Sequence, residues 1–207
     1  MRVLVVYYSM TGGVFRLATR IAEGARAAGA DVRLRRVPDL LPAEVLAERP
    51  DLRAALDAQR AVDLATIDDL VWADGVAFGS PTRFGNMTAQ LKNFLDQTGP
   101  LWAEGKLIGK AAGFFTGAQT MHGGHESTIL GMATYAYHHG MVIVPAGYGI
   151  PAVGGTTTGG GPYGPTELGS KGPELSEDEA TIAHEFGKRL AEVAGALAAA
   201  RSAAGGR

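Results

Sequence analysis

The chain of 207 residues contains no cysteine, which excludes disulfide bonds, thiolate metal sites and thiol-based catalysis. It also lacks an apolar run near the ~20 residues of a membrane span. Because the first expected strand begins at Arg2, we expect no signal peptide. These absences lead us to expect a cytoplasmic protein without membrane insertion.

The chain also lacks a large excess of either positive or negative charge, because the formal net charge is only -2. This balance argues against nucleic-acid binding and against the strongly acidic surface that docks basic electron-transfer proteins. The expected partners are therefore small molecules or further copies of this chain.

Apolar segments of two kinds alternate along the sequence. Short β-branched runs predict strands, and segments with apolar residues at helical spacing predict the helices between them. The strands are expected at 3–7, 32–37, 75–79, 111–115 and 141–144. The alternation predicts an α/β fold, a doubly wound five-stranded parallel sheet with helices on both faces. A ligand then belongs at the carboxyl ends of the strands.

The length suits one domain, expected over residues 1–200, with a frayed tail at 201–207. Prolines interrupt segment 38–70, which we expect to be a loop with one or two short helices. Segment 147–173 is rich in glycine and proline, so its composition permits a disordered linker, while its tyrosines favour an ordered loop. A capping box from Ser176 to Glu179 opens the last expected helix.

A glycine-rich turn follows the first expected strand. Its residues are Ser9, Met10, Thr11, Gly12, Gly13 and Val14. Free N–H groups at the start of a helix hold phosphate, and the hydroxyls of Ser9 and Thr11 add donors without any lysine or arginine. The alternative is a turn in which serine and glycine only cap the helix.

A second polar turn follows the strand at 75–79. It contains Ser80, Pro81, Thr82, Arg83, Phe84 and Gly85. A planar cation beside an aromatic ring suits the edge and face of a flat heterocycle, so the two turns together point to a flavin. The dinucleotide pattern G-x-G-x-x-G, a P-loop and the acidic residues of a response regulator are all absent from the expected positions.

Five separated blocks resemble the WrbA-type NAD(P)H:quinone oxidoreductases, a flavodoxin-like family, over nearly the whole chain. The blocks are 7–10 (Tyr-Tyr-Ser-Met), 81–87 (Pro-Thr-Arg-Phe-Gly-Asn-Met), 94–99 (Phe-Leu-Asp-Gln-Thr-Gly) with Leu101 and Trp102, 138–145 (His-His-Gly-Met-Val-Ile-Val-Pro) and 162–164 (Pro-Tyr-Gly). The resemblance implies a flavodoxin-like fold, FMN as cofactor, NADH or NADPH as electron donor, and assembly into a homotetramer.

The same resemblance implies roles for individual residues. Ser9 to Val14 would hold the FMN phosphate. Thr82, Arg83 and Phe84 would contact the isoalloxazine, with Pro81 and Gly85 as further cofactor-binding residues. Segment 116–123 would border the pyrimidine edge of the isoalloxazine. The residues implied there are Thr116, Gly117, Ala118, Gln119 and Gly123. Two departures stand out: Thr11 replaces a tyrosine that often touches the nicotinamide nucleotide, and segment 116–124 is one residue longer and poorer in serine and glycine.

The resemblance also implies that His138 stands over the flavin as the catalytic residue, with Trp102 as a wall of the substrate pocket. The neighbouring His139 would point about 100° away on a helix and could cap carbonyls. The five histidines show neither cysteine support nor an HExxH pattern, so we expect no metal site.

These features predict two-electron reduction of quinones by NADH or NADPH through FMN, with ping-pong kinetics. Two alternatives remain open. One is a flavodoxin-like carrier that passes single electrons to protein partners, and the other is a binding protein that keeps the fold without flavin.

Overall fold

The computed structural model describes residues 1–203, without the side chains of Ala43, Ala47, Asp51 and Ser170. In chain order the elements are β1 (Arg2–Tyr7), α1 (Gly13–Ala27), β2 (Asp31–Arg36), α2 (Ala43–Ala47), α3 (Pro50–Ala58), α4 (Ile67–Trp72), β3 (Gly75–Pro81), α5 (Ala89–Asp96), α6 (Gly99–Ala103), β4 (Ala111–Ala118), α7 (His125–His138), β5 (Val142–Ile143), α8 (Pro151–Gly155), β6 (Thr166–Leu168), a 3-10 turn (Gly169–Lys171) and α9 (Glu177–Ala203).

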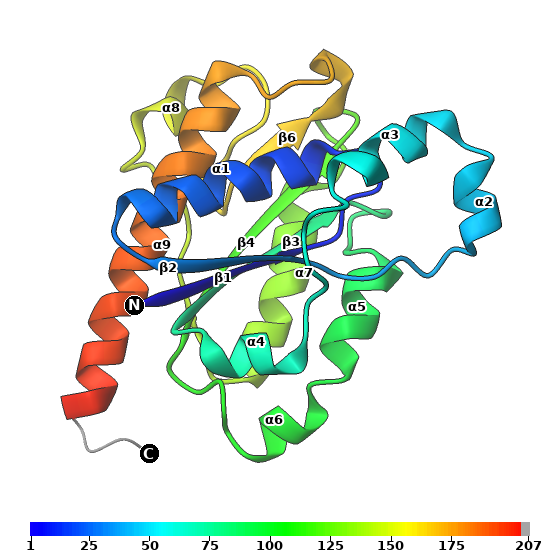
Figure 1. The fold of residues 1–207 in the computed structure, drawn as a ribbon. Coiled ribbons are helices and arrows are strands. Elements are labelled where there is room, and N and C mark those ends of the chain that lie inside the picture. The colour runs from blue at the N-terminus through cyan, green and yellow to red at the C-terminus, as the bar shows by residue number, and fades with distance from the viewer. Residues whose placement is uncertain (204–207) are drawn as a thin grey trace.

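The central sheet is parallel, with the strand order β2-β1-β3-β4-β5. Helices α1 and α9 cover one face, and α4, α5 and α7 cover the other (Figure 1). Side chains of β1 alternate between the two cores, with Val3 and Val5 on the α1/α9 side and Leu4 and Val6 opposite. The predicted α/β architecture is therefore confirmed.

A sixth strand corrects the prediction of five. Strand β5 pairs with β4 only at Ala111 and Ala112, so the carboxyl half of β4 has no partner there. Strand β6 takes this place in parallel, from the Thr116–Thr166 pair to the Ala118–Leu168 pair. It follows that the segment expected as a loop supplies part of the sheet at its ligand-binding end.

The buried carboxylate of Glu179 orders segment 147–173. Its Oε1 accepts hydrogen bonds of 2.8 Å from the N–H groups of Gly159 and Leu168. Its Oε2 accepts one of 2.8 Å from the Ser176 N–H, while the Ser176 hydroxyl accepts from the Glu179 N–H. The predicted capping box is present, and its glutamate also holds β6, so the segment is an ordered loop.

The first insertion contains more structure than expected. Segment 38–70 includes α2 and α3 and the beginning of α4, whose capping box pairs Thr66 with Asp69. Helix α5 begins at Ala89 and buries Leu91, Phe94 and Leu95. At the other end α9 continues to Ala203, into the expected tail, and residues 204–207 lie outside the described residues. Within residues 1–203, no helix has both the length and the apolar character needed to cross a membrane.

Two glycines let helices α1 and α9 touch backbone to backbone. A methyl group at Gly24 would lie 1.8 Å from the His184 carbonyl oxygen, and one at Gly187 would lie 2.1 Å from that of Ile21. Because both obstacles are backbone atoms, neither side chain movement nor a new rotamer can make room.

We expect Gly187→Ala to destabilise the fold by about 2 kcal/mol or more, because α9 must move away from α1. Gly195→Ala on the same helix is the control, since its new methyl group meets only the flexible Met1 side chain, at 3.2 Å from the sulfur. Denaturant unfolding measures both, and equal stabilities would contradict the close approach.

Candidate active site

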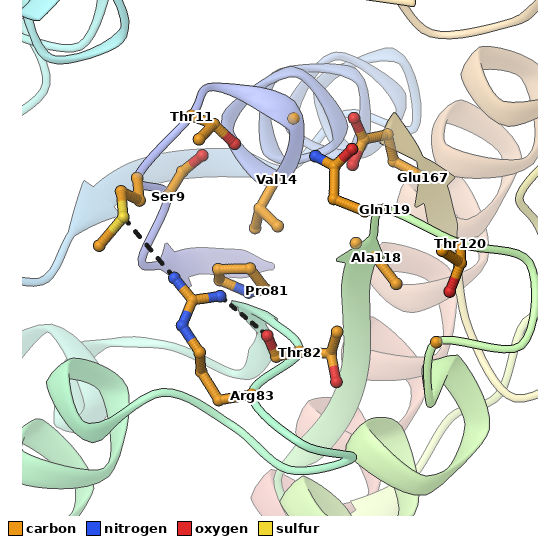
Figure 2. A pocket seen from close by; sticks show the side chains of 14 residues that line it. Ser9, Thr11, Val14, Pro81, Thr82, Arg83, Ala118, Gln119, Thr120 and Glu167 are labelled. Atoms are coloured by element: carbon orange, nitrogen blue, oxygen red, sulfur yellow. Dashed lines mark hydrogen bonds between the residues drawn. The ribbon is translucent and has the colours of Figure 1, made fainter. Parts of the chain in front are cut away.

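A cavity of about 330 Å³ lies at the carboxyl ends of β1, β3 and β4 (Figure 2). We call it the main cavity because three of the expected segments meet in it. It is lined by Ser9, Met10, Thr11, Gly13, Val14, Pro81, Thr82, Arg83, Gly117, Ala118, Gln119, Thr120, Gly123 and Glu167. The structure thus brings together three of the expected segments at the expected edge of the sheet. Thr120 and Glu167 are additional.

The first wall is the turn before α1. Gly12 stands before the helix with φ 94°, in the left-handed region that suits glycine, and itself does not line the cavity. No side chain caps α1, and its first turn carries no acidic residue. Its N–H groups therefore remain free to bind an anion, which argues against the interpretation that this turn only caps the helix.

A residue of segment 38–70 holds the Ser9 turn in place. Gln59, just after α3, is buried, and its amide donates to the Ser9 carbonyl at 3.2 Å and to the Ala55 carbonyl at 2.7 Å.

The second wall comes from Thr82 and Arg83. The Arg83 guanidinium donates to the Thr82 carbonyl at 2.8 Å and lies 3.7 Å from the Met10 sulfur. Figure 2 shows it bridging the two walls.

Phe84 does not face the main cavity. Arg83 and Asn86 exchange backbone hydrogen bonds of 2.7 and 3.0 Å, so the turn between them is tight. Phe84 has φ 54°, a strained conformation for an aromatic residue, and its side chain is fully exposed. Gly85, with φ 80°, also lies outside the lining. Phe84, expected to contact the flavin ring, therefore lies outside the lining of this cavity in one chain.

The third wall follows β4. Gly117, Ala118, Gln119 and Gly123 line the cavity as expected. Thr116 does not, because its buried hydroxyl donates to the Ser80 carbonyl at 2.6 Å and links β4 to β3.

Glu167 on β6 is the acidic residue that sequence reasoning missed. Its side chain is 10% exposed, and one oxygen lies 3.5 Å from the Arg16 guanidinium. Burial raises the pKa of this carboxyl and the nearby Glu179 adds to the rise, while Arg16 opposes it. The available signal was that Glu167 is the single acidic residue in segment 147–173. No local pattern indicated that residues 166–168 pair with β4.

His138 and Trp102 do not line the main cavity. They line a second cavity of about 440 Å³ between α5, α6 and α7, which shares no lining residue with the main cavity. We call it the Trp102 cavity. Within one chain the structure therefore does not bring His138 to the main cavity.

His139 is buried beside this cavity rather than capping carbonyls. The Thr98 hydroxyl donates to the Leu95 carbonyl at 2.7 Å, so it accepts from Tyr135 and from His139 Nε2, each at 3.1 Å. The Nδ1 atom then carries no proton and is buried without a hydrogen-bond partner among the described residues. Burial and the neighbouring His138 lower the pKa of His139. Within residues 1–203 no three His, Cys, Asp or Glu side chains cluster as metal ligands do.

Comparison with known proteins identifies the family. Residues 1–154 match the family model described as NADPH-dependent FMN reductase. The chain belongs to this family. A relative from Geotalea daltonii, named NAD(P)H dehydrogenase (quinone), is 47% identical over 97% of this chain and 100% of its own. A relative of the same name from Geobacter sulfurreducens is 46% identical over 95% and 99%.

Solved structures agree. The flavodoxin, WrbA-like protein from Agrobacterium tumefaciens superposes with a TM-score of 0.63 at 27% identity, covering 94% of this chain and 98% of that one. An archaeal flavodoxin, 19% identical, gives 0.61 over 94% of this chain and 99% of its own, which supports the fold alone. The resemblance to the WrbA-type proteins and the flavodoxin-like fold are confirmed.

Family membership makes FMN the cofactor of this chain, and the residues of the main cavity fit it with one exception. The uncapped start of α1, with the Ser9 and Thr11 hydroxyls, suits the phosphate, and Arg83 offers a cation for the ring. Gly13 and Gly117 leave space that a side chain would fill. The exception is the Glu167 carboxylate, which lies in that space.

We expect Gln59→Leu to weaken FMN binding about threefold to tenfold, because the Ser9 carbonyl loses the amide that holds the turn in place. Flavin fluorescence quenching measures the affinity. Gln97→Leu is the matched control, because the amide of the exposed Gln97 donates to the Asn93 carbonyl of α5 and does not line the main cavity. An unchanged affinity in Gln59→Leu would show that the turn holds its shape alone.

Proposed function

We propose that this chain transfers two electrons from NADH or NADPH to quinones, giving hydroquinones, through FMN bound in the main cavity. One observation carries the proposal: an uncapped helix start, Arg83 and the end of β4 meet in one cavity of a chain 47% identical to an NAD(P)H dehydrogenase (quinone). Each turnover consumes NAD(P)H, one proton and one quinone. When bound, FMN supplies the acceptance and return of the hydride.

The residues of this chain bind and orient. Ser9 and Thr11 hold the phosphate end, and Arg83 attracts negative charge that develops on the ring. Thr11, which lines the cavity in the turn before α1, contacts the nicotinamide nucleotide. NAD(P)+ leaves before the quinone enters the same place, which gives ping-pong kinetics. We infer a cytoplasmic location, in keeping with the absence of cysteine.

A homotetramer would complete this site. Large apolar side chains are exposed on several elements, among them the strained Phe84 next to Arg83, Trp102 at 59% on α6 and Tyr148 at 72%. Their exposure supports the proposal that further copies of the chain cover them. We infer that a neighbouring copy brings its Trp102 cavity against the main cavity, so that its exposed His138 reaches the quinone.

The direct test is anaerobic mixing of the FMN-loaded protein with NADH and then with benzoquinone, followed at the flavin absorbance band. We expect rapid bleaching and full recovery. Bleaching that fails despite bound FMN would favour the single-electron carrier. Failure to bind FMN would overturn the proposal.

In the same experiment His138→Ala should slow the recovery by quinone roughly 100-fold, because a general acid is lost. Bleaching by NADH and FMN affinity should change little. His184→Ala serves as the matched control, because His184 lies on α9 and lines neither cavity. An unchanged recovery rate would remove His138 from the mechanism.

Phe84→Asn should shift the protein from tetramer toward smaller species in sedimentation velocity. Asparagine tolerates the left-handed conformation, so the turn itself should keep its shape. Ile108→Asn is the control, because Ile108 is 63% exposed but precedes β4 at the opposite end of the sheet. Equal sedimentation of both variants and the parent chain would exclude Phe84 from the interface.

A further inference from the structure

The phosphate end of the main cavity already holds an anionic group. A methyl group at Gly13 would lie 2.4 Å from both carboxylate oxygens of Glu167, and one at Gly117 would lie 2.5 Å from Oε2. The carboxylate is therefore packed against the first residue of α1 and against β4. Figure 2 shows it beside the start of α1, inside the cavity.

Arg16 lies at the same place. One guanidinium nitrogen is 3.5 Å from Glu167 Oε1, and another is 3.1 Å from where a Gly12 methyl group would stand. Its Nε is buried without a hydrogen-bond partner in the described part of the chain. The guanidinium thus covers the start of α1 and has donors to spare.

The Glu167 carboxylate is held loosely for so buried a charge. Within residues 1–203 the structure gives it the long ion pair with Arg16 and no hydrogen bond. Its backbone carbonyl, by contrast, is 3.2 Å from His125 Nε2, and β6 is fixed by Glu179. The backbone is anchored while the acid group lacks partners that would keep it in place.

We propose that Glu167 competes with the FMN phosphate for Arg16 and for the amino end of α1, so that cofactor binding displaces or protonates this carboxylate. The reason is electrostatic, because two anions cannot share one buried anion site without a large cost. Glu167 then sets how strongly the phosphate contributes to flavin affinity. The inference rests on FMN as the cofactor of the proposed function.

A dependence on pH follows. The charged groups near the carboxylate are Arg16 from α1 and Glu179 from α9, with Arg83 across the cavity. The titratable His125 of α7 contacts the Glu167 backbone carbonyl. Protonated Glu167 does not repel the phosphate, so FMN affinity should fall as pH rises through the Glu167 titration. The phosphate of FMN also titrates, near about pH 6. A variant without the carboxylate separates the two effects.

The experiment measures dissociation constants of the flavin-free protein for FMN and for riboflavin, which lacks the phosphate, at about pH 6 and about pH 8. Glu167→Gln should bind FMN about tenfold tighter than the parent chain at the higher pH, with a smaller gain at the lower pH. Riboflavin affinity should stay within about twofold, since the neutral ligand carries no charge to repel.

Three further variants complete the design. Arg16→Gln should weaken FMN but not riboflavin, in the parent chain and in the Glu167→Gln background alike. Glu174→Gln removes the same charge from an exposed position after β6 and should leave both affinities unchanged. Glu167→Ala checks that the gain comes from the lost charge, and circular dichroism establishes that each variant folds.

Two results would overturn the proposal. Equal FMN affinity in Glu167→Gln and the parent chain at both pH values would mean that the carboxylate does not meet the phosphate. Weaker binding of both flavins in Glu167→Gln would make Glu167 a ligand of the shared ribityl chain. If no variant and no parent chain bound FMN, the proposed function itself would fail instead.

Discussion

The main cavity depends on one buried carboxylate. Glu179, in the first turn of α9, accepts hydrogen bonds from the N–H groups of Gly159 and Leu168. It thereby links both residues to a helix that packs on the sheet beside α1. Without these bonds β6 would have little to hold it, because it is three residues long and pairs with β4 alone. The strand that carries the cavity residue Glu167 is therefore held in place by hydrogen bonds made outside the cavity.

The site combines rigid and adaptable parts. Strand ends of β1, β3 and β4 supply fixed backbone positions, whereas the two insertions supply side chains that brace or narrow the space between them. Gln59 supports the Ser9 turn from one insertion, and Glu167 enters from the other. A common fold thereby gains features of its own at the phosphate end without any change in the sheet that forms the floor.

The sequence predicts the parts that local chemistry decides. Runs such as 3–7 form strands because their apolar residues alternate between two cores, and the turns at Ser9 and Thr82 stand where those strands end. Pairing of β6 with β4 links residues about 50 apart in the chain, and no local pattern encodes it. The outward Phe84 and the separate position of His138 are likewise set by turn geometry and helix packing, which a family motif does not reveal.

The close contact between α1 and α9 also sets the order in which the molecule can mature during translation. One side of β1, with Val3, Val5 and Tyr7, is covered in part by α9 residues such as Phe186 and Leu190. A ribosome delivers those residues only after the whole sheet has emerged. Until then the nascent chain exposes an apolar sheet face, so folding finishes late and this half of the core is the part a chaperone would meet.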